Sequence, residues 1–428
     1  MRSGIAALVL GAIVPGLARA EDGCGAFDRA LVEIAEQTKD GGLLIALAPL
    51  LSPAAVSALV RRAESEPNAL GEKMLYAVGL SGQAEGLRLL HERPLPRALA
   101  RPRAVAMFAL GEGVHSTTVS ATLAEASGDA RAEIAEVLGH VRQPRARDIL
   151  EGMVQDPDPR VRLAVGESLI GQKSARARKV LLDLSHASDA ELASRAARAL
   201  AESHFLQGAL EELPAALQGR AAVRLAVKGH KDVIARARQD VMLADHEKRA
   251  TAFAVMVVSP DETPATLETR SKKAVERYGP RAGLELKMAQ ALLGDTPAIA
   301  ALEAADPAFQ PGPALVLIAF AEAGRAHAQL PREQAVRLVS ALSRWSLEEK
   351  LWGKTLDALA VVAGDAVLPL AKSRLGGPEG PGLASAFEVI GRAGKKSDVP
   401  SLIESARRPI STALRATALG AAARLCPR

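Results

Sequence analysis

The sequence predicts an all-α protein, a right-handed α-solenoid of about eleven stacked two-helix repeats. Leucines recur at a constant spacing, since Leu138, Leu169 and Leu200 are each 31 residues apart. Hydrophobic residues make up 48% of the chain and aromatic residues only 3%, so alanine and leucine must supply most of the core. These residues favour closely packed helices over sheets. A repeat of this length buries its apolar face by stacking on its neighbours, which produces a solenoid.

Residues 1–20 have the pattern of a cleaved secretory signal peptide. Arg2 gives a positive start, residues 5–14 form an apolar stretch, and Ala18-Arg19-Ala20 supplies small residues before the cleavage point. We expect cleavage after Ala20 and a periplasmic or secreted mature chain without an integral membrane segment. The alternative is an uncleaved anchor, but an apolar stretch of this length is far shorter than the roughly 20 residues that span a bilayer.

The charge of the chain is small in total and uneven along it. The net charge is +5, and two of the positive charges, Arg2 and Arg19, belong to the predicted signal peptide. The mature chain is therefore close to neutral for its size, and general affinity for nucleic acid is not expected. Residues 21–72 hold nine acidic and four basic residues, whereas residues 392–428 hold eight basic and two acidic residues. The two ends of the chain should attract each other, within one molecule or between two.

The first elements after the signal are a cap and the clearest repeats. Residues 21–66 contain apolar-periodic segments separated by glycine and proline, and we expect an N-terminal helical cap there. The repeat array is expected over residues 67–375 and is clearest over residues 129–203. Within it, Asp158 is a natural N-cap, and Pro159 fits the first helical position, which needs no N–H. Further units are expected to start at Asp129 and Asp189.

Other parts of the array are predicted from weaker copies of the same pattern. The expected first helices of these repeats lie at residues 74–79, 105–111, 220–227, 249–258, 284–294, 315–324, 351–364, 384–391 and 414–425. Residues 259–270 and 306–313 contain prolines and are expected to be longer connections between helices. Residues 376–382, Gly-Gly-Pro-Glu-Gly-Pro-Gly, are predicted to form a hinge before the C-terminal repeats and cap at 383–428. The register of the repeats after residue 204 stays open.

The segment 156–171 resembles HEAT-like repeats, of the short class also found in phycobilisome lyases. That class favours Asp-Pro, then Val-Arg, then small residues and Leu-Gly, and residues 156–171 follow this order. The resemblance implies a helical scaffold that binds partners on a curved surface. The predicted signal peptide implies export, and the excess of arginine over lysine with a single asparagine, Asn68, is typical of a bacterial protein. It also implies that Asp156 and Arg162 occupy positions whose side chains form a ladder between successive repeats.

The chain contains two cysteines, Cys24 and Cys426, one near each end. A lone pair of cysteines in an oxidising compartment is usually bonded. A bond within one chain requires the solenoid to curl into a near-ring, because a disulfide needs Cα atoms about 5.5 Å apart. Three alternatives remain open: a bond within one chain, a head-to-tail bond between two chains, and two free thiols.

The sequence contains no set of residues with the spacing of a catalytic, cofactor-binding or metal site. Two His-Glu pairs occur, His91-Glu92 and His246-Glu247, whereas the di-iron enzyme of the HEAT-like family uses four such pairs. We therefore expect a non-enzymatic scaffold for protein–protein interaction with no cofactor. The alternatives are a metal-dependent or lyase-type HEAT-like enzyme, and a binder of envelope polysaccharide or anionic lipid. The contacts of such a binder would be Lys395, Lys396, Arg407 and Arg408.

Overall fold

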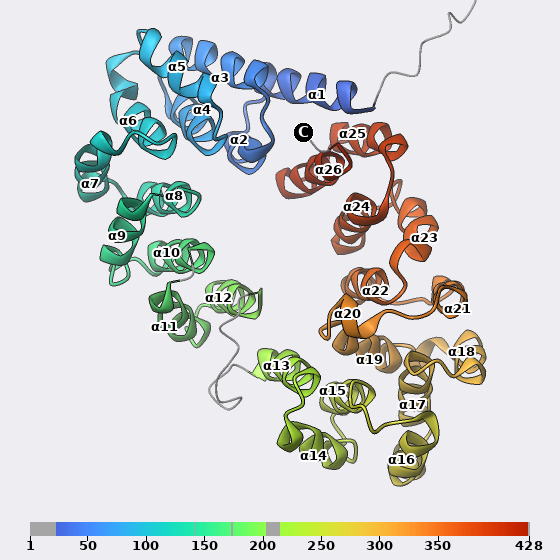
Figure 1. The fold of residues 1–428 in the computed structure, drawn as a ribbon. Helices are drawn as coiled ribbons and strands as arrows, with labels where there is room; N and C mark the ends of the chain where they lie inside the picture. The colour runs from blue at the N-terminus through green and yellow to red at the C-terminus, as the bar shows by residue number, and fades with distance from the viewer. Residues whose placement is uncertain (1–22, 142, 173, 203–214, 427–428) are drawn as a thin grey trace, which may run out of the picture.

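The computed structural model describes residues 23–141, 143–172, 174–202 and 215–426, and these residues form helices without any β-strand. The prediction of an all-α solenoid is confirmed. The helices stand in two rows that together make a ring (Figure 1). The inner row consists of α2 (Gly41–Leu47), α4 (Ala69–Leu80), α6 (Ala100–Ala109), α8 (Gly128–Gly139), α10 (Pro159–Gly171), α12 (Ala190–Glu202), α13 (Ala215–Val227), α15 (His246–Val257), α19 (Pro311–Ala321), α22 (Glu349–Val362), α24 (Pro381–Ala393) and α26 (Thr412–Leu425).

The outer row surrounds the inner one and supplies one partner helix to most inner helices. It consists of α1 (Gly23–Gln37), α3 (Pro53–Ser65), α5 (Ala84–Glu92), α7 (Ser116–Glu125), α9 (Pro144–Gly152), α11 (Ala175–Ser185), α14 (Lys231–Asp240), α16 (Pro264–Tyr278), α18 (Thr296–Glu303), α21 (Arg332–Ser343), α23 (Leu368–Ser373) and α25 (Val399–Arg407). Two helices lie outside this simple alternation. Helix α17 (Pro280–Leu292) packs on α16, α18 and α19, and the short α20 (Arg325–Ala328) contacts α19 and α22.

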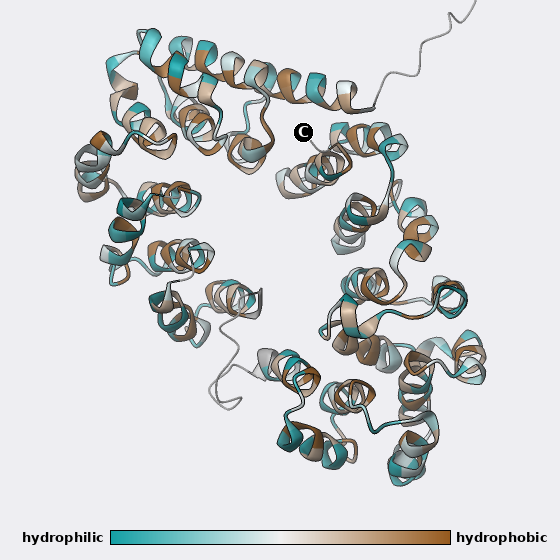
Figure 2. Cartoon of the chain, viewed as in Figure 1, coloured by the Kyte–Doolittle hydropathy of each residue, from teal (hydrophilic) through white to brown (hydrophobic). Residues whose placement is uncertain are grey.

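The core lies between neighbouring helices. Leu138, Leu169 and Leu200 occupy equivalent places in α8, α10 and α12, and each is at most 1% exposed. The 31-residue period therefore marks successive inner helices. Figure 2 shows that many helices carry both hydrophobic and hydrophilic residues, as expected for helices buried on one side. The segments expected as first helices coincide with inner helices, except for residues 284–294, which lie in α17.

One capping device recurs at the start of inner helices and gives their register. Ser127, Asp158 and Asp189 accept backbone N–H groups at the first turns of α8, α10 and α12, again 31 residues apart. An arginine four residues after the N-cap donates to carbonyls just before the helix: Arg131 to Ala126 (2.8 Å) and Arg162 to Asp156 (2.7 Å). These bonds satisfy carbonyl groups that the turn leaves without a partner.

The same device identifies the register of a later repeat, which the sequence leaves open. Asp245 accepts the N–H groups of Glu247 and Lys248 at the start of α15. Arg249, four residues after Asp245, donates to the carbonyls of Leu243 and Ala244. Helix α15 therefore begins in the same way as α8 and α10, although it lacks the Asp-Pro and Val-Arg pattern of α10.

Inner helices approach one another closely at small residues. A Cβ at Gly79 of α4 would lie 2.9 Å from the Cα of Ala106, and one at Gly391 of α24 would lie 2.7 Å from the Cα of Ala421. At Gly139 of α8 the nearest atom would be the Oγ of Ser168, at 2.5 Å. The inner row follows a shorter path around the ring than the outer row, so its helices must lie closer together, and small residues at the contacts allow this.

The two proline-containing connections expected at 259–270 and 306–313 are wrong in extent. Helix α16 begins at Pro264, and α19 begins at Pro311. Both prolines occupy first-turn positions, where the missing N–H costs nothing, so proline here starts a helix. Thr263 adds a capping box to α16. The segment predicted to be a hinge lies between α23 and α24, and its Pro381 is likewise the first residue of a helix.

Candidate functional site: the seam and the inner face of the ring

The ring closes through a repeat built from both ends of the chain (Figure 1). In the outer row, α1 lies between α25 and α3, and in the inner row α26 lies beside α2. Helices α1 and α26 also contact each other. The last inner helix and the first outer helix therefore form one two-helix unit, which we call the composite repeat (residues 23–37 and 412–425).

A disulfide joins the two halves of the composite repeat. Cys24 in α1 is bonded to Cys426, which directly follows α26, across a sequence separation of 402 residues. Their Cα atoms are 5.4 Å apart, within the normal range for such bonds. Of the three alternatives left open by the sequence, the structure contains the bond within one chain.

The seam between the chain ends is packed as a continuation of the core. Phe27, Leu31 and Leu43 near the N-terminus are at most 2% exposed and belong to the same apolar cluster as Leu402 and Leu419. Backbone also meets closely, since a Cβ at Gly23 would lie 2.8 Å from the carbonyl oxygen of Lys396. The N-terminal helices predicted as a cap thus cover the last repeat as well as the first.

Polar contacts at the seam join the acidic beginning of the chain to its basic end. Arg407 donates to Glu33 (3.1 Å), and Thr412 donates to the carboxylate of Asp40, the N-cap of α2. Burial acts to raise the pKa of Asp40, but the hydrogen bonds from Thr412 and from backbone N–H groups, with the charge of Arg415, hold it below its ordinary value. These contacts favour the ionised form of Asp40 in the closed ring.

Of the four predicted basic contact residues, two are bonded to other parts of the protein and two are exposed. Arg407 pairs with Glu33, and Arg408 donates to the carbonyls of Leu375 (2.6 Å) and Gly377 (3.0 Å). Lys395 and Lys396 are exposed beside the 3-10 turn η8 (Lys396–Asp398). The structure does not bring these four side chains together as one open patch.

Ion pairs connect different inner helices along much of the ring. Each joins residues that lie in, or directly follow, two different inner helices: Lys73–Glu133, Arg195–Glu167 (2.9 Å), Arg224–Glu322 (3.1 Å), Arg392–Asp357 (3.8 Å) and Arg424–Glu388 (2.5 Å). The inner face is therefore polar and carries both signs of charge.

The ladder expected at Asp156 and Arg162 has its inter-repeat contact at a different arginine. Asp156 binds Arg131 of the preceding repeat through two hydrogen bonds, at 2.9 and 3.0 Å. Arg162 instead caps carbonyls within its own repeat. Arg131 could have been found in the sequence, because it precedes Arg162 by one repeat length.

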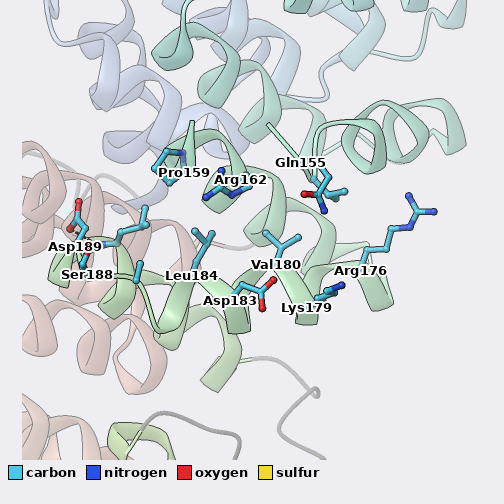
Figure 3. A pocket seen from close by; sticks show the side chains of 13 residues that line it. Gln155, Pro159, Arg162, Arg176, Lys179, Val180, Asp183, Leu184, Ser188 and Asp189 are labelled. Carbon is cyan, nitrogen blue, oxygen red and sulfur yellow. Dashed lines mark hydrogen bonds between the residues drawn. The ribbon is translucent and has the colours of Figure 1, made fainter. Parts of the chain in front are cut away.

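An open pocket of about 700 Å³ lies where α10, α11 and α12 meet (Figure 3). Val180 and Leu184 form part of its apolar wall, and Arg162 with Asp183 and Asp189 adds charges of both signs. A second pocket of about 630 Å³ lies beside α6 and includes Val114, a large apolar side chain that is 78% exposed. Both pockets are shallow recesses on the repeats.

The two His-Glu pairs lie at helix ends. His91-Glu92 ends α5, and His246-Glu247 begins α15. His91 and His115 each approach a carboxylate oxygen of Glu112, at 2.5 and 3.2 Å. Among the residues that the structure describes, no group of three or more histidine, cysteine or acidic side chains is arranged to hold a metal ion. None of the described helices is long and apolar enough to cross a membrane.

Comparison with known proteins identifies the repeat type. Residues 116–201 match the family model of HEAT repeats. No curated protein matches the chain. Among solved structures, the karyopherin Kap121p bound to the SUMO protease Ulp1p is 13% identical with a TM-score of 0.29, over 94% of this chain. An engineered protein is 16% identical with a TM-score of 0.24, over 96% of this chain and 97% of its own. The chain spans 45% of the length of the karyopherin.

Proposed function

Because the chain is an all-α solenoid that contains HEAT repeats, we propose that it is an exported, non-enzymatic scaffold that binds a protein partner on the inner face of its ring. Stacked helical repeats typically present a long curved surface to a protein partner. The observation that carries this proposal is the row of ion pairs on the inner helices. A polar surface with both signs of charge suits a partner surface of complementary pattern, since such complementarity gives specificity.

The distribution of basic residues favours this function over binding of anionic lipid or polysaccharide. Arg407 and Arg408 are engaged with Glu33 and with backbone carbonyls. A binder of anionic surfaces needs several free cations on one face. A vesicle or polysaccharide retention assay on Lys395→Ala/Lys396→Ala tests this alternative, and salt-sensitive retention that the double variant abolishes would support it over the scaffold.

Photo-crosslinking from matched positions tests the inner face. A photoreactive amino acid replaces Glu136, exposed on inner helix α8, or Arg147, exposed on outer helix α9. The expected result is a crosslink to the same protein band from position 136, and none from position 147, in cells that produce the protein. Crosslinks of equal yield from both positions, or from neither, would contradict the proposed binding face.

Export requires its own test, because residues 1–20 lie outside the described residues. We propose that the mature protein begins at Glu21 and is periplasmic or secreted. Intact mass and N-terminal sequencing of protein isolated from its own host should give a chain that starts at Glu21. A full-length chain that retains Met1 in the cytosolic fraction would refute export.

A further inference from the structure

We propose that the composite repeat is an exchangeable junction: α1 of one molecule can pair with α26 of a second copy, which gives a dimer closed by two such repeats. The two faces of this junction come from opposite chain ends and are unlike each other. Among the residues that the structure describes, the disulfide between Cys24 and Cys426 is the covalent link between these two faces, and a second copy could supply either face. Exchange of identical elements between protomers is a low-cost route to dimers.

The contacts that seal the junction all run between the two ends. Arg407 of the C-terminal end pairs with Glu33 of the N-terminal end, and Thr412 bonds Asp40. Phe27 and Leu31 of α1 belong to the apolar cluster that includes Leu402 and Leu419. A second copy can provide every one of these groups with the same geometry.

The curvature of the solenoid decides whether exchange is feasible. In a solenoid most contacts lie between neighbouring repeats, so a small change at many of these interfaces moves the ends far apart. Two open molecules joined at both ends form a larger closed ring that needs less curvature per repeat. This head-to-tail arrangement has twofold closure, so it stops at a dimer and forms no open filament. The disulfide within one chain then acts to keep the monomer closed.

Mixing two single-cysteine variants tests exchange. One variant is Cys24→Ser and the other, ¹⁵N-labelled, is Cys426→Ser; neither can form the bond within its own chain. The expected product under mild oxidation is a covalent heterodimer whose peptide map contains a bond between Cys24 and Cys426. It should form at least about tenfold faster than Cys426–Cys426 dimers in the first variant alone, because docking raises the local concentration of the two thiols.

A charge reversal separates exchange at this junction from random collision. Arg407→Glu is added to the Cys24→Ser variant, and Glu33→Arg to the Cys426→Ser variant. Both junctions of the heterodimer then pair opposite charges, whereas each monomer places like charges across its own seam. The heterodimer yield should rise severalfold over the pair without the charge changes. Helix content and monomer mass of each variant alone confirm that both fold.

The outcomes decide the proposal in either direction. No Cys24–Cys426 bond between labelled and unlabelled chains, with both variants folded, would overturn it. So would a heterodimer yield that falls or stays constant when the charges are reversed. Neither result bears on the inner-face crosslinks that test the scaffold function.

Discussion

Cys24 and Cys426 join α26 to α1 in the place where a loop joins the two helices of an ordinary repeat. In those repeats the chain runs from an inner helix to its outer partner, as from α8 to α9 and from α24 to α25. Cys426 directly follows inner helix α26, and Cys24 is the second residue of outer helix α1. The disulfide thus completes a repeat with the same inner-to-outer direction.

Loss of the disulfide should destabilise the seam before the rest of the ring. In Cys24→Ser/Cys426→Ser the unfolded chain is no longer held in a closed loop, and the chain-entropy model gives a loss of stability of about 6 kcal/mol for a loop of this length. Because stability in repeat proteins is local, we expect faster amide hydrogen exchange in α1, α2 and α26. Exchange in α8 and α10 serves as the internal control. Exchange that becomes faster to the same extent in all helices, or that does not become faster in α1, α2 and α26, would count against the composite repeat.

Close packing of the inner row can be tested with two glycines in adjacent helices. Gly391→Ala places a methyl group 2.7 Å from the Cα of Ala421 and should lower the free energy of unfolding by about 1–3 kcal/mol. Gly420→Ala is the matched control, because its Cβ meets nothing within 4 Å. This control should be neutral or stabilising by up to about 1 kcal/mol, the ordinary gain of alanine over glycine in a helix. Urea denaturation of both variants gives the comparison, and equal effects would contradict close contact at Gly391.

The buried ion pair between Arg249 and Glu285 should be sensitive to removal of one partner. Both residues are at most 1% exposed, and Arg249 donates to both carboxylate oxygens, at 2.5 and 2.8 Å. Arg249→Met leaves a buried carboxylate without its partner and should cost about 3–5 kcal/mol in the free energy of unfolding at pH 7. Replacing both, as Arg249→Met/Glu285→Leu, should restore most of that loss, and a double variant worse than the single one would refute this explanation.

The same pair predicts a pH dependence. Burial raises the pKa of Glu285, although Arg249 opposes this. A carboxyl with a raised native pKa binds its proton more tightly in the folded state, so its contribution to stability improves as pH falls. Arg249→Met removes the opposing charge, and its deficit relative to wild type should be larger at pH 7 than at pH 5. Denaturant titrations at both pH values measure it, and an equal or larger deficit at pH 5 would contradict the prediction.

The inter-repeat bond of Asp156 should matter more than an exposed ion pair nearby. Burial acts to raise the pKa of Asp156, but hydrogen bonds from Arg131 and the Asp158 N–H hold it below its ordinary value. Asp156→Ala should cost about 1–3 kcal/mol, the usual worth of charged hydrogen bonds. The control Asp129→Ala removes a pair with Arg160 in which both side chains are more than half exposed, and should cost under about 1 kcal/mol. Thermal unfolding near neutral pH compares them, and the reverse order would be inconsistent with the structure.

The sequence predicts the helical class and the inner row because both depend on local signals. The period of Leu138, Leu169 and Leu200 and the N-cap at Asp158 are readable from residue type and spacing. Closure of the ring is not local, because it depends on how successive inner helices pack along the whole chain, including the close contacts at Gly79 and Gly391. Sequence therefore identifies Cys24 and Cys426 as candidates for a bond without deciding between the alternatives.

The sequence indicates which charged residues lie at the repeat contacts, but it does not indicate which residues they bond. The resemblance points to Asp156 and Arg162, but Asp156 bonds an arginine of the preceding repeat. Long side chains reach across repeats, so pairing depends on the distance between helices and not on spacing within one segment. Pro264 and Pro311 were interpreted as part of connections between helices, but each lies at the start of a helix. Proline interrupts the interior of a helix and is favoured in its first turn, so its presence alone does not distinguish a connection from a helix start.

Small-angle X-ray scattering of the oxidised monomer tests ring closure most directly. We expect a pair-distance distribution that matches the closed ring and ends at the ring's diameter, with the same curve at every dilution. A distribution that extends well beyond that diameter, as an open arc or rod with separated chain ends would give, would contradict the closed ring.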